Sequence, residues 1–173
     1  MLQQHQLFVK ASKCSFAQQH LDYLGHVIGV NGVATDPDKV RAVQQWPEPK
    51  NVKQLRRFLG LAGYYRKFIK GFGVLAKPLI EFLKKDVAYK WEFSQQQSFD
   101  SVKQALVQAP VLALPNFNLQ FVVETDASEK GIGAVLMQQG HPIAYISKAL
   151  GMKAQGMSTY EKECMAILMA VSK

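Results

Sequence analysis

Apolar and polar residues follow two different periods along this chain. Residues 121–136 have the pattern of a β-hairpin, with an apolar run, a polar turn at residues 129–131 and a second apolar run. Residues 142–147 predict a third strand, which gives a three-stranded antiparallel meander. A helix is predicted over residues 160–171, and its expected buried stripe is Cys164, Ile167, Leu168 and Val171.

The first part of the chain also predicts strands. Residues 7–16 and 21–28 form two apolar segments, a turn follows at residues 29–32, and residues 33–34 form a short return. Gly25 falls inside the second segment, where a glycine indicates close approach by another backbone or a ligand. Three strands bury too little surface to be stable alone, so we expect this segment to be the end of a larger domain.

Helices are predicted between these two sheets. Asp36 and Asn51 are suitable N-caps for helices over residues 37–46 and 52–69. Further helices are predicted over residues 74–85 and 94–108. This order of strands and helices is typical of an α+β protein.

One face of the helix over residues 52–69 is not apolar. Arg56, Gly60 and Tyr64 are four residues apart and so lie in one row, with Gly63 beside them. A glycine inside a helix costs about 0.5–1 kcal/mol relative to alanine, so two of them indicate that something approaches the backbone closely. That partner is either another helix or a molecule bound from outside, and spacing alone favours neither.

The distribution of charge favours an external molecule over another helix as the partner of this face. The net charge of +8 is carried by residues 31–90, since residues 31–60 hold six Lys and Arg against three Asp and Glu, and residues 61–90 hold seven against two. Such a concentrated excess indicates a polyanionic partner, with nucleic acid first among the candidates. Several cations lie on the glycine-bearing helix, which favours a phosphate backbone there: Arg57, Arg66, Lys67 and Lys70.

Composition limits the class of protein. The chain has 173 residues, of which 48% are apolar, enough for a buried core. It has no apolar run long enough to span a membrane and no signal peptide pattern. Cys14 and Cys164 fit a reducing compartment better than a disulfide framework. We therefore expect an intracellular protein without a membrane partner, whether in the cytoplasm, a virus-like particle, the nucleus or an organelle.

Asp126 is a candidate for chemistry because it follows the first strand of the hairpin, beside an apolar sheet. Such an aspartate either makes a side-chain hydrogen bond in the turn or binds a metal ion. Glu163 on the last helix is the nearest candidate for a second ligand, although a glutamate near a helix N-terminus also interacts with the helix dipole. Two carboxylates converging there suit Mg²⁺, while cleavage by paired metal ions needs further acidic ligands.

Short motifs along nearly the whole chain resemble the C-terminal half of reverse transcriptases from long-terminal-repeat retrotransposons of the Ty3/gypsy type. The order and spacing of these motifs are what make the resemblance specific. They are Lys13-Cys-Ser-Phe16, Tyr23-Leu-Gly-His26, Trp46-Pro-Glu-Pro49, Leu55-Arg-Arg-Phe-Leu-Gly-Leu61, Tyr64-Tyr-Arg-Lys-Phe68, Ala109-Pro-Val-Leu112, Thr125-Asp-Ala-Ser128, Gly131-Ile-Gly-Ala-Val-Leu136 and Glu161-Lys-Glu163 with Ala166-Ile167.

The resemblance implies three parts. Residues 1–35 are similar to the end of the polymerase palm, with the hairpin that holds the primer terminus, and residues 36–90 to the helical thumb. Residues 91–173 are similar to an incomplete RNase H domain, with a three-stranded antiparallel sheet and a packed helix. The nucleic-acid-binding residues implied are Leu24, Gly25, His26, Lys53, Arg56, Gly60, Tyr64, Arg57 and Lys67. Asp126 and Glu163 match the first two acids of the nuclease and are the implied catalytic Mg²⁺ ligands.

The resemblance also implies a function. The parent enzyme makes DNA on an RNA template and hydrolyses the RNA of the hybrid, so the expected partners are a template–primer duplex or RNA–DNA hybrid and the rest of the Pol polyprotein. The paired polymerase aspartates and two nuclease acids are absent from this sequence, so we expect little or no catalysis by the chain alone. The alternative is a non-catalytic nucleic-acid-binding relic or a pseudogene product. An unfinished sheet also favours self-association.

Overall fold

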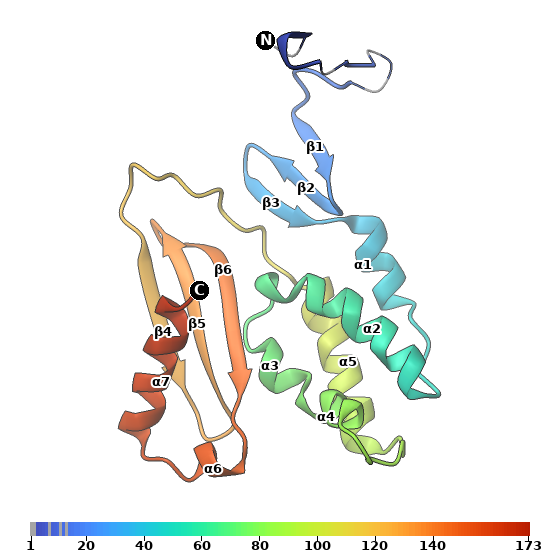
Figure 1. The fold of residues 1–173 in the computed structure, drawn as a ribbon, viewed down its shortest axis with the longest axis vertical. Helices are drawn as coiled ribbons and strands as arrows, with labels where there is room; N and C mark the ends of the chain where they lie inside the picture. Colours follow the sequence, from blue (N-terminus) through green and yellow to red (C-terminus); the bar gives the residue numbers. More distant parts are fainter. Residues whose placement is uncertain (1–2, 7, 11, 13) are drawn as a thin grey trace.

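The computed structural model describes residues 3–6, 8–10, 12 and 14–173. The chain forms two three-stranded antiparallel sheets and a group of helices, and in Figure 1 the first sheet lies above the helices α1–α5 while the second lies beside them. The strands of the first sheet are β1 (His20–Tyr23), β2 (His26–Gly29) and β3 (Gly32–Thr35), and those of the second are β4 (Val122–Ala127), β5 (Gly131–Gln138) and β6 (His141–Ala149). Both sheets are meanders in which consecutive strands pair. The predicted mixed α+β class is confirmed.

The helices begin at the predicted caps. The Asp36 side chain accepts from the backbone N–H of Asp38, and Asn51 accepts from that of Gln54. Ser158 and Glu161 form a reciprocal capping box at the last helix. The α-helices are α1 (Pro37–Gln44), α2 (Val52–Tyr64), α3 (Phe72–Leu75), α4 (Lys77–Ile80), α5 (Phe93–Val107), α6 (Met152–Gln155) and α7 (Thr159–Val171), and short 3₁₀ turns cover Gln3–His5, Arg66–Phe68 and Glu81–Leu83.

The main hydrophobic core lies among the helices. It runs from Val43 to Leu112 and includes the closely packed rings of Phe58 on α2 and Phe99 on α5, whose centroids are 4.5 Å apart. Trp91 is partly buried and packs against this cluster. Because α5 shares one core with α1–α4, packing is continuous across the predicted boundary between residues 90 and 91. The division into three parts therefore stays a prediction.

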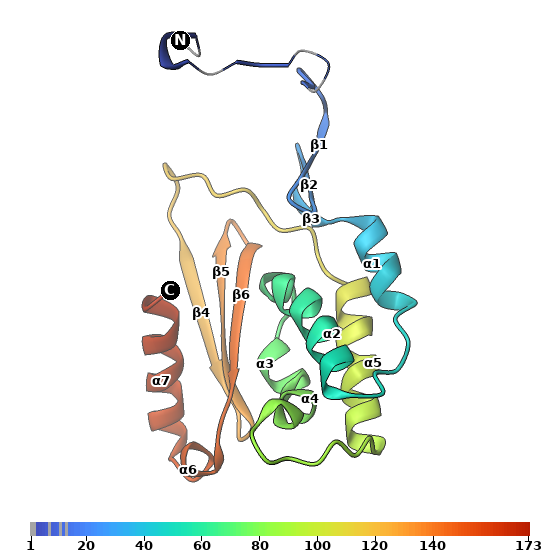
Figure 2. The same ribbon diagram turned by 45° about the vertical axis from the view of Figure 1, so that its right-hand side comes forward.

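The second sheet is covered on both faces. Helix α7 packs against β4 and β5, while α3 packs against β6 from the other side (Figure 2). The α3 contact is close, because a Cβ on Gly73 would lie only 2.8 Å from the Ser147 carbonyl oxygen. The Gly73 N–H also donates to the Ser147 hydroxyl at 2.8 Å. This sheet and the helical layer are therefore directly packed on each other.

The extended segment after α5 links the two sheets. Leu112 and Val33 exchange two backbone hydrogen bonds of 2.7 and 2.8 Å, and the Ala113 N–H donates to the Pro142 carbonyl at 2.7 Å. Gly32 permits this approach, since a Cβ there would lie 2.1 Å from the Leu112 carbonyl oxygen. The last strand of the first sheet is thus tied to the segment that leads into the second.

Several predicted elements differ in the structure. The strand over residues 7–16 is absent from its described residues, and residues 7, 11 and 13 lie outside them. Residues 21–28 are not one strand, because Leu24 and Gly25 form the turn between β1 and β2. The helix predicted to reach residue 69 ends at Tyr64 and continues as a 3₁₀ turn. The helix over residues 74–85 is broken into α3, α4 and a 3₁₀ turn around Pro78.

The buried stripe predicted for α7 was wrong. Cys164 is exposed, and so are Ile167, Leu168 and Val171, the last at 80%. The side of α7 that meets the sheet is marked instead by Ala166, which is fully buried against Ile132 and Leu150. Met165 and Met169 also pack against this cluster, so the helical period places Ile167, Leu168 and Val171 on the other side of α7.

Candidate nucleic-acid interface

The row on α2 lies at the surface. Arg56, Gly60 and Tyr64 are all exposed, whereas Leu55 and Phe58 on the opposite side of the helix are fully buried. The period of an α-helix explains this division, because residues four apart share one face. The predicted row is therefore available to a partner outside the described chain.

The glycines of α2 do not serve helix packing. A Cβ added to Gly60 or Gly63 would meet no atom within 4 Å. Gly73, by contrast, does lie against a neighbouring backbone. The alternative explanation for the α2 glycines, tight contact with another helix, is thus contradicted among the described residues, and the open backbone at Gly60 is left for an external partner.

The same face is strongly cationic. Residues 49–80 contain eight Lys and Arg and no Asp or Glu. Lys53, Arg57 and Lys67 are exposed, and within the described part of the chain neither they nor Arg56 form an ion pair. The Lys67 ammonium lies 5.3 Å from the centre of the Phe68 ring, and partial desolvation lowers the pKa of Lys67. These cations are suited to bind phosphate groups.

The turn of the β1–β2 hairpin lies beside the end of α2. Leu24 and Gly25 both have positive φ angles, 50° and 74°, as a type I′ turn requires. The Tyr64 hydroxyl donates to the Leu24 carbonyl, and the Tyr65 hydroxyl donates to the Gly25 carbonyl at 2.6 Å. A close approach by another backbone or a ligand was predicted at Gly25, but among the described residues the approach is made by tyrosine side chains. A Cβ there would lie 3.0 Å from the Tyr65 hydroxyl oxygen.

His26 follows this turn and is half-buried. Its ring packs against Tyr64, Tyr65 and Phe68, with centroids 5.2, 5.6 and 5.4 Å away. Its Nδ1 is buried and has no hydrogen-bond partner in the described structure. The Leu24 side chain, in contrast, is 70% exposed at the tip of the turn. Leu24 and Gly25 therefore offer the turn's accessible surface, and His26 supports it from below.

Tyr65 is a residue whose role the sequence did not indicate. Its helical spacing assigned it to the apolar side of the helix, and its ring is indeed 2% exposed within the main core. Its hydroxyl nevertheless reaches the hairpin turn. The pair of adjacent tyrosines was the available signal, but the partner of the Tyr65 hydroxyl lies forty residues earlier in the sequence.

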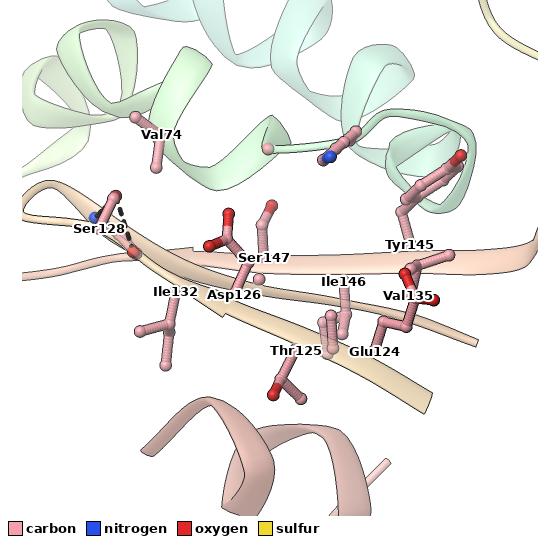
Figure 3. Close-up of a pocket in the computed structure, with 15 residues that line it drawn as sticks. Val74, Glu124, Thr125, Asp126, Ser128, Ile132, Val135, Tyr145, Ile146 and Ser147 are labelled. Atoms are coloured by element: carbon pink, nitrogen blue, oxygen red, sulfur yellow. Dashed lines mark hydrogen bonds between the residues drawn. The ribbon is translucent and has the colours of Figure 1, made fainter. Parts of the chain in front are cut away.

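Asp126 lines a cavity of about 190 Å³ between the second sheet and the α3 region, with Lys70, Val74, Tyr145 and Ser147. Figure 3 shows Asp126 and Ser147 pointing toward α3, while Thr125 points toward α7. Asp126 makes no side-chain hydrogen bond among the described residues. Ser128 instead makes the turn's side-chain bonds, both to the backbone of Gly131. The turn-stabilising alternative for Asp126 therefore has no support.

Glu163 does not line this cavity. It lies on α7, which covers the opposite face of the sheet, and it is half-buried. Strand β4, which carries Asp126, and helix α7, which carries Glu163, are therefore in contact, but Glu163 does not line the cavity beside Asp126. Among the described residues, no group of three or more His, Cys, Asp or Glu could hold a metal ion. The described residues therefore offer no third ligand of these types to join Asp126 and Glu163.

Comparison with known proteins defines the class. Residues 91–173 match the family described as the RNase H-like domain found in reverse transcriptase. The chain is also similar to two solved foamy viral protease–reverse transcriptase structures. One, in complex with RNA/DNA hybrid, has a TM-score of 0.84 at 23% identity over 92% of this chain and 22% of that one. The other, in complex with dsDNA, has a TM-score of 0.82 at 24% identity over 90% of this chain and 34% of that one. The fold is that of a reverse transcriptase–RNase H region.

Relatives define the family more closely. The chain is 40% identical over 167 residues to the retrovirus-related Pol polyprotein from transposon 297 of Drosophila melanogaster, covering 95% of this chain and 16% of that protein. It is 38% identical to the Pol polyprotein from transposon gypsy of the same organism, over 95% of this chain and 17% of that protein. It is also 38% identical to the transposon Tf2-3 polyprotein of Schizosaccharomyces pombe, over 94% of this chain and 12% of that protein.

Residues 91–173 therefore belong to the RNase H-like domain family of reverse transcriptases, and the whole chain is similar to the corresponding region of Ty3/gypsy-type retrotransposon Pol polyproteins, as the motifs predicted. It spans about a sixth of the length of the two Drosophila relatives. Among the described residues, no helix is long and apolar enough to cross a membrane.

Proposed function

We propose that this chain binds the duplex of a template–primer or RNA–DNA hybrid, as one segment of a Pol polyprotein that synthesises DNA on RNA and hydrolyses the RNA. The contact surface proposed is the exposed face of α2 together with the β1–β2 turn. The observation that carries the proposal is the open backbone at Gly60, with Arg56, Arg57 and Lys53 on the same helix and no Asp or Glu in residues 49–80.

Each part of this surface has a physical role in such a complex. Lys53, Arg57 and Lys67 would contact phosphates, which fixes position without reading sequence. Gly60 would admit a sugar–phosphate strand or groove edge close to the helix, with Arg56 and Tyr64 on either side. Leu24 and Gly25 would meet the duplex at the neighbouring turn. That the foamy viral structures with a similar fold are complexes with RNA/DNA hybrid and dsDNA supports this assignment.

The experiment is a salt series of binding to a labelled RNA–DNA hybrid, measured by fluorescence anisotropy. Affinity should fall steeply with salt, because each neutralised phosphate releases counterions. The double variant Arg56→Ala and Arg57→Ala should bind more weakly and lower the salt slope by about 0.9 for each phosphate that is no longer neutralised. Lys153→Ala on α6, distant from α2 in Figure 1, is the matched control and should change neither value. Binding that ignores salt, or no binding, would reject the proposal.

For Asp126 and Glu163 we propose a role as metal ligands in the parent nuclease only, together with acidic residues that this chain does not bring to them. Mg²⁺ would then supply charge stabilisation at the scissile phosphate. The alternative function, a non-catalytic nucleic-acid-binding relic, would give the same duplex binding by this chain. Identity of 38–40% over nearly its whole length supports the Pol polyprotein reading.

Self-association stays a proposal of its own. Among the described strands, β4 pairs only with β5, so its outer edge is free, and Val122 and Val123 are about half exposed. Such an edge is a template for pairing with a second chain. Sedimentation velocity should show dimers or larger species, and a single monomeric species over a wide concentration range would reject the proposal.

A further inference from the structure

The Gly25 carbonyl is a junction between three elements. It accepts a hydrogen bond from the Tyr65 hydroxyl at 2.6 Å and one from the backbone N–H of Asp36 at 3.3 Å. Gly25 belongs to the β1–β2 turn, Tyr65 follows the end of α2, and Asp36 is the N-cap of α1. One backbone oxygen therefore connects the hairpin to both helices.

The turn has few other means of keeping its position. Strand β1 is exposed along its whole length, and β2 is only half-buried. The far end of the sheet is held by the backbone pairing of Val33 with Leu112. At the turn end, the hydroxyls of Tyr64 and Tyr65 make the side-chain hydrogen bonds found between the turn and α2.

Tyr65 is the better anchor of the two. Its ring is buried in the main core, so its hydroxyl is held by packing on all sides. Tyr64 is 49% exposed and lies in the proposed contact row itself, so it is free to exchange its bond for a contact with a ligand. The hydrogen bond from the buried Tyr65 therefore fixes the position of the turn relative to the core.

We infer that Tyr65 is a positioning residue that holds the Leu24–Gly25 turn in register with the basic face of α2, so that one duplex meets both at once. This inference rests on the proposed function and deepens it. Tyr65 itself touches no nucleic acid in this arrangement, because its side chain is covered. Its effect on binding is therefore entirely through the turn.

The test compares Tyr65→Phe with the parent 173-residue chain in the hybrid-binding assay. Phenylalanine keeps the buried ring and removes only the hydroxyl. Affinity should fall by about three- to tenfold, the range expected for removal of one neutral hydrogen bond that orders the surface. The salt slope should not change, since every phosphate-binding side chain is still present. If Tyr65→Phe instead weakened binding through lost phosphate contacts, the dependence of affinity on salt would become less steep.

Tyr89→Phe is the matched control, because the Tyr89 hydroxyl also donates to a backbone carbonyl, that of Pro49, away from the turn. It should bind the hybrid like the parent chain. Gly25→Ala approaches the same contact from the hairpin side, where its Cβ would meet the Tyr65 hydroxyl at a φ of +74°. The two variants combined should weaken binding by less than the product of their separate effects, because both break one contact.

The outcomes are distinguishable. If the parent chain binds with a steep salt dependence and Tyr65→Phe binds equally well, the inference is wrong and the proposed function stands. If the parent chain does not bind, both fail. If Tyr65→Phe does not fold, the inference is decided by Gly25→Ala: weaker binding at an unchanged salt slope supports it, and unchanged affinity overturns it.

Discussion

The Tyr65 hydroxyl donates a 2.6 Å hydrogen bond to the Gly25 carbonyl across forty residues of sequence. This contact joins the tip of the first sheet to the end of the helix that carries the basic row. Tyr65 is the C-cap residue of α2, so the contact lies where this helix ends. Two surfaces that the sequence presents separately thereby become neighbours.

Removing this hydroxyl should lower stability. We expect Tyr65→Phe to reduce the free energy of unfolding by about 1 kcal/mol, the usual worth of a buried neutral hydrogen bond. Tyr23→Phe, at an exposed position in β1, is the control and should change it by less than about 0.5 kcal/mol. Urea denaturation followed by circular dichroism measures both. Equal stability of the two variants would contradict the structural importance of the bond.

The same contact predicts a dependence on alkaline pH. Burial, followed by the charge of Asp36 and the proximity of Tyr64, raises the pKa of Tyr65 to about 12. In the unfolded chain the phenol loses its proton at pH ~10. The folded state therefore holds the proton longer, and the stability from neutral Tyr65 is complete below about pH 10 and is lost as pH rises toward 12.

The measurement for this prediction is the difference in unfolding free energy between the parent chain and Tyr65→Phe across that pH range. Burial also raises the pKa of Tyr89, but Tyr89 is present in both chains and cancels in the difference. The difference should shrink as pH rises from about 10 to 12. A constant difference would show that Tyr65 does not titrate as its environment predicts.

Gly60→Ala should separate stability from binding. Because a Cβ there meets nothing within 4 Å, alanine should stabilise α2 by about 0.5–1 kcal/mol. Affinity for the hybrid should nevertheless fall, since the methyl group would occupy the proposed close approach. Gly73→Ala is the opposite case: its Cβ would lie 2.8 Å from the Ser147 carbonyl oxygen, so it should destabilise the chain by about 1–3 kcal/mol. A Gly60→Ala chain that is more stable and binds equally well would exclude a close approach at this site.

Catalysis by this chain alone should be negligible. Asp126 faces the α3 side of the sheet and Glu163 is carried by α7 on the other side, so the two acids proposed as metal ligands do not line one cavity. With Mg²⁺ and a labelled RNA–DNA hybrid, we expect no cleavage, and Asp126→Asn should behave like the parent chain. Robust Mg²⁺-dependent cutting that disappears in Asp126→Asn would show that the acids do converge.

Much of this fold was predictable because its signals are local. The caps at Asp36 and Asn51, the hairpin over residues 121–136 and the exposure of the Arg56 row all follow from residue type and period within one element. Charge favoured an external polyanion over helix packing as the partner of the Gly60 face, and the open space around Gly60 argues against helix packing there.

What could not be predicted depends on contacts between elements. The spacing of apolar residues in α7 does not show that Ala166, rather than Leu168, faces the sheet. The buried side depends on how closely the helix packs on the strands. The direction of Asp126 likewise depends on which helix covers which face. The partner of the Tyr65 hydroxyl lies outside any local pattern.

In the proposed complex, the face of α2 and the adjacent hairpin turn form one duplex-binding surface. Amide chemical-shift mapping by NMR during titration with an RNA–DNA hybrid reports on every part of that surface at once. The largest changes should cluster at Lys53, Arg56, Gly60, Tyr64, Leu24 and Gly25, with α7 unaffected. Changes confined to α7 or the outer edge of β4, with the α2 face silent, would show that the duplex binds elsewhere.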